Sequence, residues 1–348
     1  MDLSARRQLA TALTRVENQS GNWREILRAC IRQAGDALVI GVTGPPGAGK
    51  STLVDALAVH WASQGEMVAV LAIDPASPFS GGAVLGDRVR MTRSEGNDRI
   101  FIRSMSARGH SGGLNAAALD LCTVMAGHGA SRILIETVGV GQNEVEVAFV
   151  ADCTLVVSVP GLGDSVQAAK AGLLEVGDIY IVNKGDLPGA PAVARDLSNM
   201  LALVFPGLPG ASHSQADRSM MVSIPGATRK LLSARYGAPD DPGGSWHPPV
   251  IAVSALNGQA IGELAGWFSA FESWLRHSPA GDRRRRERVR LQLVTLLKQR
   301  LFDRLQSRHG DDPATALSEW IAPVLSGKLD VHAATDQILQ DKGPPHAQ

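Results

Sequence analysis

The chain has 348 residues, 44% of them hydrophobic, which is enough to bury one large core and still carry additional helices. Its 34 Lys and Arg residues balance 34 Asp and Glu residues, so the net charge gives no indication of a nucleic-acid or membrane partner. The three widely spaced cysteines disfavour a disulfide framework or a C-x-x-C metal site, and no apolar run approaches the roughly 18 residues of a membrane span, so we expect a cytoplasmic protein.

Apolar runs that favour β-strands recur along the chain, with helical patterns between them. They cover residues 37–42, 68–73, 100–104, 133–136, 154–159, 179–182 and 250–253. This alternation is typical of βαβ units and predicts an α/β fold with a doubly wound, mainly parallel sheet. Because ligands of such sheets bind at the carboxyl ends of the strands, the motifs that follow the runs are the candidates for function.

A phosphate-binding loop follows the first run. It matches the pattern G-x-x-x-x-G-K-[ST] at every fixed position and precedes a predicted helix over residues 52–61. Backbone N–H groups of such a loop turn toward the phosphates, Lys50 reaches the β and γ oxygens, and the Ser51 hydroxyl ligates Mg²⁺. The predicted nucleotide contacts are Gly44, Pro45, Pro46, Gly47, Ala48, Gly49, Lys50, Ser51 and Thr52. The sequence therefore predicts binding of a nucleoside triphosphate, with a chance glycine-rich turn as the alternative.

Two carboxylates and an arginine follow the second run. Asp74 closes the run at residues 68–73, and Asp87 lies in the string GDRVRM. A carboxylate at a strand end within the nucleotide crevice is a candidate magnesium ligand. Arg90 is a candidate for supplying positive charge to the γ-phosphate, with a plain surface arginine as the alternative.

The run at residues 133–136 ends in Glu136, which we expect to serve Mg²⁺ through its water shell. Gly139 is placed to donate its N–H to the γ-phosphate. Most P-loop GTPases have Asp-x-x-Gly here, and the residue after Gly139 is Val140, which cannot orient a water molecule, so we expect slow intrinsic hydrolysis. Gln142 is a candidate substitute. The candidate catalytic residues are then Lys50, Asp74, Arg90, Glu136 and Gln142.

A base-reading motif is predicted at residues 183–186, directly after a strand. The pattern N-K-x-D is the guanine reader of P-loop GTPases. The carboxylate of Asp186 accepts hydrogen bonds from N1–H and the exocyclic amine of guanine, a donor pair that adenine lacks. Asn183 and Lys184 brace the loop and cover the ring face. Without the neighbouring motifs, a solvated turn would be an equally good interpretation.

An accessory loop follows the last strand, at Ser254, Ala255 and Leu256. It resembles the loop whose backbone N–H contacts the guanine carbonyl oxygen in P-loop GTPases. A base reader in the right place, downstream of a phosphate loop, is more specific than either motif alone. GTP with Mg²⁺ is therefore the predicted cofactor, in preference to ATP.

The C-terminal residues 279–348 are expected to form a helical dimerisation arm on a GTPase domain at residues 37–278. Val289, Leu293, Leu297, Leu301 and Leu305 recur every four residues and predict an amphipathic helix. The preceding run Arg283 to Arg286 is interpreted as a solvated face, not a nucleic-acid site. The apolar stripe packing on the chain's own domain is the alternative. Residues 206–246, rich in Gly, Pro and Ser, are predicted to be a surface loop insertion.

Together the motifs resemble the MeaB/ArgK family, which includes bacterial chaperones of methylmalonyl-CoA mutase and a human mitochondrial counterpart. The strings that carry the resemblance are GVTGPPGAGKST from residue 41, DPASP from 74, GGAVLGDRVRM from 81, ETVGVGQNE from 136, PGLGDSVQAAKAG from 160, NKGD from 183 and PPVIAVSALNGQAIGEL from 248. The resemblance covers most of residues 1–205 and 246–348. The segment 206–246 departs from the family pattern, which leaves the partner open.

The resemblance implies a SIMIBI-type G-domain in a homodimer, with N-terminal helices over residues 1–36. It also implies GTP hydrolysis coupled to loading and protecting an adenosylcobalamin-dependent acyl-CoA mutase. It assigns Mg²⁺ and γ-phosphate sensing to Ser51, Asp74, Asp87 and Glu136. It also implies a switch loop at residues 161–170, in which Gln167 and Lys170 report the nucleotide state. The alternatives are an ATP/GTP-dependent kinase linked to arginine and ornithine transport, and a GTP-binding scaffold without significant turnover. Neither a nucleic acid nor a membrane is expected as a partner.

Overall fold

The computed structural model describes residues 1–74, 91–106, 113–137, 147, 150–161, 176–204, 235–237, 244–309 and 318–339. The chain divides into two compact units, Met1–Gln292 and Leu293–Gln348. The sheet and all described residues of the predicted nucleotide site belong to the first unit. The segment boundaries expected after residues 36 and 278 stay predictions.

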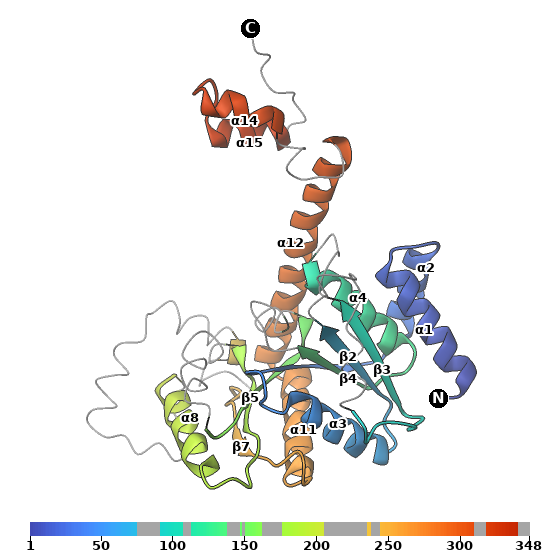
Figure 1. The fold of residues 1–348 in the computed structure, drawn as a ribbon, viewed down its shortest axis with the longest axis vertical. Helices are drawn as coiled ribbons and strands as arrows, with labels where there is room; N and C mark the ends of the chain where they lie inside the picture. The colour runs from blue at the N-terminus through green and yellow to red at the C-terminus, as the bar shows by residue number, and fades with distance from the viewer. Residues whose placement is uncertain are drawn as a thin grey trace. The chain divides into compact units, whose positions relative to one another are not determined.

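Within the described residues, seven strands form one parallel sheet in the order β3-β2-β4-β1-β5-β6-β7 (Figure 1). They are β1 (Leu38–Thr43), β2 (Val68–Asp74), β3 (Ile100–Ser106), β4 (Arg132–Thr137), β5 (Cys153–Ser158), β6 (Ile179–Val182) and β7 (Val250–Ala252). Strands β2, β3 and β4 lie on one side of β1, and β5, β6 and β7 lie on the other, which confirms the predicted doubly wound sheet. The carboxyl end of β1 is therefore the switch point at which such sheets bind ligands.

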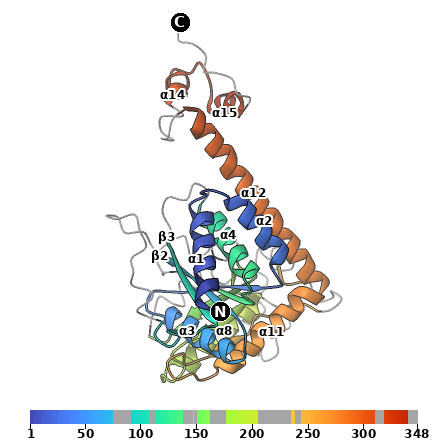
Figure 2. The same ribbon diagram turned by 90° about the vertical axis from the view of Figure 1, so that its right-hand side faces the viewer.

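Alternate residues of β2 enter two separate cores, one on each face of the sheet. Along β2, Val68 and Val70 join the core that contains α3 (Lys50–Ser63) and α11 (Ile261–His277). Ala69 and Leu71 join the other core, with α1 (Leu3–Glu17), α2 (Trp23–Gln33) and α4 (Gly113–Gly127), which lie side by side in Figure 2. Burial on both faces explains why the strands are almost continuously apolar. A further helix, α8 (Ala190–Val204), packs beside β6 and β7.

Helix α12 (Pro279–His309) is attached to the sheet by its arginines, so the interpretation of this basic run as a solvated face is wrong in part. The side chain of Arg284 is 11% exposed, and its two terminal nitrogens donate to the two carboxylate oxygens of Asp178 at 2.6 Å, directly ahead of β6. Arg288, one turn later, pairs with Asp152 ahead of β5 at 2.5 Å. Arg286 is 80% exposed. Residues four apart share a helix face, so both pairs lie on the face of α12 that is turned toward the sheet.

The expected surface insertion at residues 206–246 ends in buried aromatic residues where the structure describes it. Tyr236 is 1% exposed, and its hydroxyl donates to the carbonyl oxygen of Gly177 at 2.7 Å. Trp246 is 7% exposed, and its indole N–H donates to the carbonyl oxygen of Asp178 at 2.8 Å. Both rings therefore bury their apolar bodies while their polar tips are hydrogen-bonded. The end of this segment belongs to the core.

The second unit contains α14 (Ser318–Leu325) and α15 (Val331–Leu339), and the boundary between the units falls within α12. Trp320 on α14 and Ala334 on α15 are buried. The apolar residues of α12 that the sequence predicts as a stripe are exposed: Val289 49%, Leu293 63%, Leu297 60% and Leu301 43%. None of the described helices combines the length and apolar character needed to cross a bilayer.

Candidate nucleotide-binding site

The phosphate loop joins β1 to α3. It passes so close to residues of neighbouring strands that two of its positions have room only for glycine. Gly44 has φ +144° and Gly49 has φ +81°, values that side chains rarely allow. A Cβ on Gly44 would collide with the carbonyl oxygen of Val157 on β5. A Cβ on Gly49 would lie 2.6 Å from the amide nitrogen of Asn183, which follows β6. These contacts and φ values explain why positions 44 and 49 need glycine.

Lys50 begins α3, and its ammonium group lies against the loop. The residue is 6% exposed, and Nζ donates to the carbonyl oxygens of Gly44 at 2.6 Å and Pro45 at 3.1 Å. The first turn of α3 adds backbone N–H groups without helical acceptors and the positive end of the helix dipole. A buried cation beside a helix N-terminus is suited to bind polyphosphate. Among the other loop residues, Pro46 and Gly47 are exposed, Ala48 is buried and Thr52 is half-buried.

Ser51 and Glu136 meet beside the loop. The Ser51 hydroxyl donates to Oε1 of Glu136 at 2.5 Å, and Glu136 at the end of β4 is 2% exposed. A hydroxyl and a carboxylate are the hard oxygen ligands that Mg²⁺ prefers, so these two residues fit the ion. No group of three His, Cys, Asp or Glu side chains suited to a metal occurs among the described residues. This is compatible with Mg²⁺, which proteins commonly hold by one or two side chains together with phosphate oxygens.

Several predicted site residues lie outside the described residues. These are Asp87, Arg90, Gly139, Gln142, Gln167 and Lys170. Asp74 ends β2, which pairs with β4, but its side chain also lies outside the described part of the chain. Their roles therefore stay predictions.

Asn183 connects the base-reading motif to the phosphate loop. It is 3% exposed, and its amide nitrogen donates to the carbonyl oxygen of Ala48 at 2.8 Å. Its amide oxygen accepts from the backbone N–H of Ala255 at 3.1 Å. Lys184 has φ +56° and is exposed, as is Asp186. One buried side chain thus holds together the three loops that the sequence assigns to phosphate and base, while the charged members of the motif face solvent.

The accessory loop is a tight turn closed by Ser254 and Gln259, which exchange backbone hydrogen bonds at 3.2 and 3.1 Å. Ser254 is 1% exposed, and its hydroxyl has no partner among the described residues. Leu256 at the tip is 72% exposed. The N–H of Ala255 donates to the side-chain oxygen of Asn183.

Sequence reasoning missed a polar corner behind the loop, formed by Asp55, Arg93 and Ser94. Asp55 is 3% exposed on α3, and its carboxylate accepts from the backbone N–H groups of Arg93 at 3.0 Å and Ser94 at 2.9 Å. The Ser94 hydroxyl donates to the same carboxylate. The guanidinium of Arg93 then reaches the accessory loop. An aspartate inside the apolar string LVDALA was the available signal, because a buried carboxylate must find donors.

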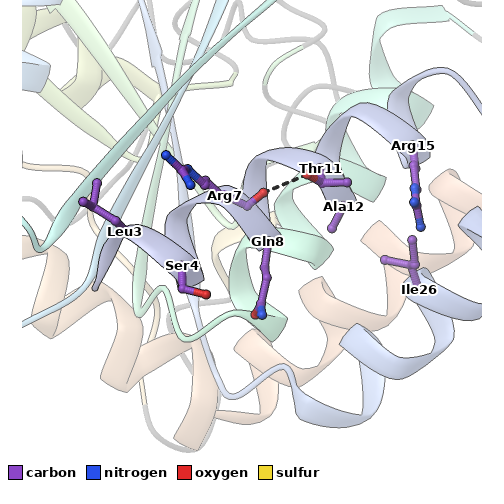
Figure 3. A pocket seen from close by; sticks show the side chains of 8 residues that line it. All are labelled: Leu3, Ser4, Arg7, Gln8, Thr11, Ala12, Arg15 and Ile26. Carbon is purple, nitrogen blue, oxygen red and sulfur yellow. Dashed lines mark hydrogen bonds between the residues drawn. The ribbon is translucent and has the colours of Figure 1, made fainter.

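A separate hollow of about 630 Å³ lies against α1 and α2 (Figure 3). It is lined by the face of α1 from Leu3 to Arg15 and by Ile26 of α2. Because α1 and α2 pack on the face of the sheet opposite α3, the hollow is not part of the nucleotide site. None of the described residues that line it carries a carboxylate.

The parallel sheet with a phosphate loop after its central strand, braced to a base-reading loop by Asn183, defines the class of P-loop nucleotide-binding proteins. The family described as "Methylmalonyl Co-A mutase-associated GTPase MeaB" matches residues 9–310, and the chain belongs to this family. It is a GTPase, in agreement with the prediction from the motifs.

Curated relatives are similar over most of the chain. A putative GTPase of Pyrococcus abyssi is 37% identical over 338 residues, which is 97% of this chain and 93% of the relative. The GTPase ArgK of Escherichia coli K12 is 40% identical over 265 residues, 74% of this chain and 70% of ArgK. A crystal structure named LAO/AO transport system kinase is 24% identical, with a TM-score of 0.60 and coverage of 97% and 93%, and supports the fold alone.

Proposed function

We propose that this GTPase gates the delivery of adenosylcobalamin to a cobalamin-dependent acyl-CoA mutase and protects the loaded enzyme. The observation that carries the nucleotide-dependent switch is the bond between Ser51 of the phosphate loop and Glu136 at the end of β4. A ligand at the phosphates is thereby connected to the segment that follows β4. The family description, which associates such GTPases with methylmalonyl-CoA mutase, supports the class of partner.

In this proposal Lys50 neutralises the terminal phosphates, and Ser51 and Glu136 hold Mg²⁺ with Asp74 and Asp87. The bound ion supplies positive charge to the phosphate oxygens. The short contact between Ser51 and Glu136 supports their assignment, because it places the carboxylate beside the hydroxyl that would ligate the ion, within reach of the ion's water shell. Lys50 is supported by its burial and its bonds to the loop carbonyls.

The guanine base is read by Asp186, with Asn183 and Lys184 supporting the loop. Asn183 is well suited to this role because it already bonds the phosphate loop and the accessory loop. The carboxylate of Asp186 would receive N1–H and the amine, which adenine cannot supply. We expect Asp186→Asn to lower GTP affinity relative to xanthosine triphosphate. Unchanged selectivity would count against the base assignment.

Intrinsic hydrolysis is slow in this proposal, because Val140 follows the glycine at the γ-phosphate and cannot orient water. Arg90 and Gln142 are the groups proposed to supply charge and to position water when the partner is bound. Gln167 and Lys170 report the nucleotide state to the mutase.

The test combines capture and turnover. The full-length protein is used to capture mutases from native lysate with GDP and with a non-hydrolysable GTP analogue, and phosphate release is then measured with and without the captured enzyme. We expect a cobalamin-dependent mutase in one nucleotide state and a hydrolysis rate that it raises. Lys50→Ala should lose both effects, whereas the surface variant Arg99→Ala should keep them. Capture of no cobalamin enzyme in either state would refute the partner.

We also propose a homodimer formed through residues 279–348. Along α12, exposed apolar residues recur at four-residue spacing, which is the pattern of a helix that packs against a partner; they are Val289, Leu293, Leu297 and Leu301, at 43–63% exposure. Leu297→Asp should convert the dimer to a monomer in light-scattering measurements of molar mass. Thr295→Asp adds the same charge to the opposite side of the helix and should leave the dimer intact. A monomeric wild-type protein would refute the arrangement.

Simple measurements distinguish the proposed function from two alternatives. A kinase linked to arginine and ornithine transport has no need of a guanine reader, so preference for GTP over ATP argues against its ATP-dependent form. A scaffold would bind GTP with a negligible rate that no partner changes. We place the protein in the cytoplasm, because its three cysteines are free and buried, as expected in a reducing compartment.

A further inference from the structure

Arg93 contacts the accessory loop through two backbone carbonyls. Its Nη1 donates to the carbonyl oxygen of Ala255 at 3.2 Å, and its Nη2 donates to that of Leu256 at 2.5 Å. The two terminal nitrogens of a guanidinium have a fixed separation and lie in one plane. Two successive carbonyl groups at the tip of the turn are therefore held in a defined orientation.

The backbone at Arg93 is itself held in place. Its own backbone N–H and that of Ser94 donate to the two oxygens of the Asp55 carboxylate, at 3.0 and 2.9 Å. Asp55 lies on α3, the helix that starts with the phosphate-binding Lys50. The arginine thus extends to the accessory loop from a buried anchor on the phosphate-binding helix, although its own side chain is exposed.

The geometry of the peptide group links this contact to the base. In a trans peptide the carbonyl oxygen and the N–H point in opposite directions within one plane. The carbonyl of Ala255 and the N–H of Leu256 belong to the same peptide, so the bond from Arg93 turns the Leu256 N–H away from the guanidinium. That N–H has no partner among the described residues, whereas the N–H of Ala255 is bonded to Asn183.

We infer that Arg93 is a positioning residue for guanine specificity: it orients the Leu256 peptide so that its N–H donates to the carbonyl oxygen at position 6 of the base. This inference rests on the proposed reading of guanine and adds the donor and the residue that aims it. Arg93 itself does not touch the nucleotide. A lysine at this position lacks the planar pair of nitrogens, so any bonds it makes to the two carbonyls come from one nitrogen and do not fix the plane of the peptide.

The experiment measures affinities of the full-length protein for three diphosphates: GDP, IDP and the diphosphate of 2-aminopurine riboside. GDP and IDP carry the carbonyl at position 6, and the 2-aminopurine compound lacks it. Arg93→Ala should weaken GDP and IDP binding by about three- to tenfold, the worth of one ordinary hydrogen bond, and should leave the third affinity unchanged. Arg93→Lys should give an intermediate loss.

The matched control is Arg99→Ala, which removes an exposed arginine that donates to the carbonyl oxygen of Gly65 at 2.8 Å, away from the accessory loop. It should bind all three diphosphates like the wild type. Urea midpoints establish that each variant is folded. Unchanged GDP affinity in Arg93→Ala, or an equal loss for all three diphosphates, would overturn the inference while leaving GTP binding intact. No GDP binding by the wild type would overturn the guanine assignment and this inference with it.

Discussion

Replacing Asp178 by alanine should be strongly destabilising. Asp178 is fully buried ahead of β6 and accepts from the backbone N–H of Thr154 at 2.7 Å. Arg284 of α12 donates to both its oxygens at 2.6 Å, and Arg235 reaches the same carboxylate at 3.3 Å. One carboxylate therefore joins a strand, the segment at residues 235–237 and the long helix.

The magnitude follows from what the substitution leaves behind. Arg284, whose side chain is 11% exposed, would keep its charge next to the rings of Tyr236 and Phe271 without a counterion. Removing one partner of a buried ion pair typically lowers the free energy of unfolding by about 3–5 kcal/mol, much of it because the remaining charge is buried without a counterion. Asp178→Asn keeps an acceptor for Thr154 and should cost less, about 2 kcal/mol.

The assay is urea unfolding followed by tryptophan fluorescence, to which Trp246 contributes directly because its indole N–H is bonded to the Asp178 carbonyl. The matched control is Asp36→Ala, which removes a carboxylate that is 86% exposed and pairs with Arg276 at 2.9 Å. Such exposed pairs contribute less than about 1 kcal/mol. A loss below about 1 kcal/mol for Asp178→Ala, or equal losses for both variants, would refute the reasoning.

Three further predictions test other parts of the molecule. Gly44→Ala should lose about 1–3 kcal/mol of stability together with GDP affinity, because the added Cβ collides with Val157. In the same urea assay, the control Gly266→Ala should gain up to about 1 kcal/mol, because Gly266 lies in α11 with open space around it. Glu136→Gln should lower Mg²⁺-dependent GTP hydrolysis by at least about tenfold while GDP affinity measured in EDTA is unchanged; full activity would contradict the metal assignment. Burial alone raises the pKa of Asp178, but the charges of Arg235 and Arg284 and the hydrogen bonds outweigh it and lower that pKa. The ionised carboxylate therefore contributes its full stability above about pH 4 and loses it as the pH falls through the folded pKa. The stability difference between wild type and Asp178→Asn should shrink over that fall in pH, and a difference independent of pH would argue against an ionised carboxylate.

The sequence by itself located the strands and the loops that bear function. Strands of a parallel sheet are apolar on both faces and are bounded by polar turns, so each appears as a local pattern. The phosphate loop is equally local, because the positive φ angles that require its glycines all fall within eight consecutive residues. The family resemblance followed from such local strings, and the GTPase prediction is confirmed.

Only the tertiary structure decided which distant residues meet. Ser51 bonds Glu136 across 85 positions, Arg93 bonds Leu256 across 163, and Arg284 bonds Asp178 across 106. Local sequence patterns do not reveal such a pair, because an aspartate, glutamate or arginine is the same letter in the sequence whether it faces water or a buried partner. The run at Arg283 to Arg286 therefore suggested a solvated face, and the polar corner at Asp55 went unnoticed, until the packing of α12 and α3 placed a counterion or a donor beside each one.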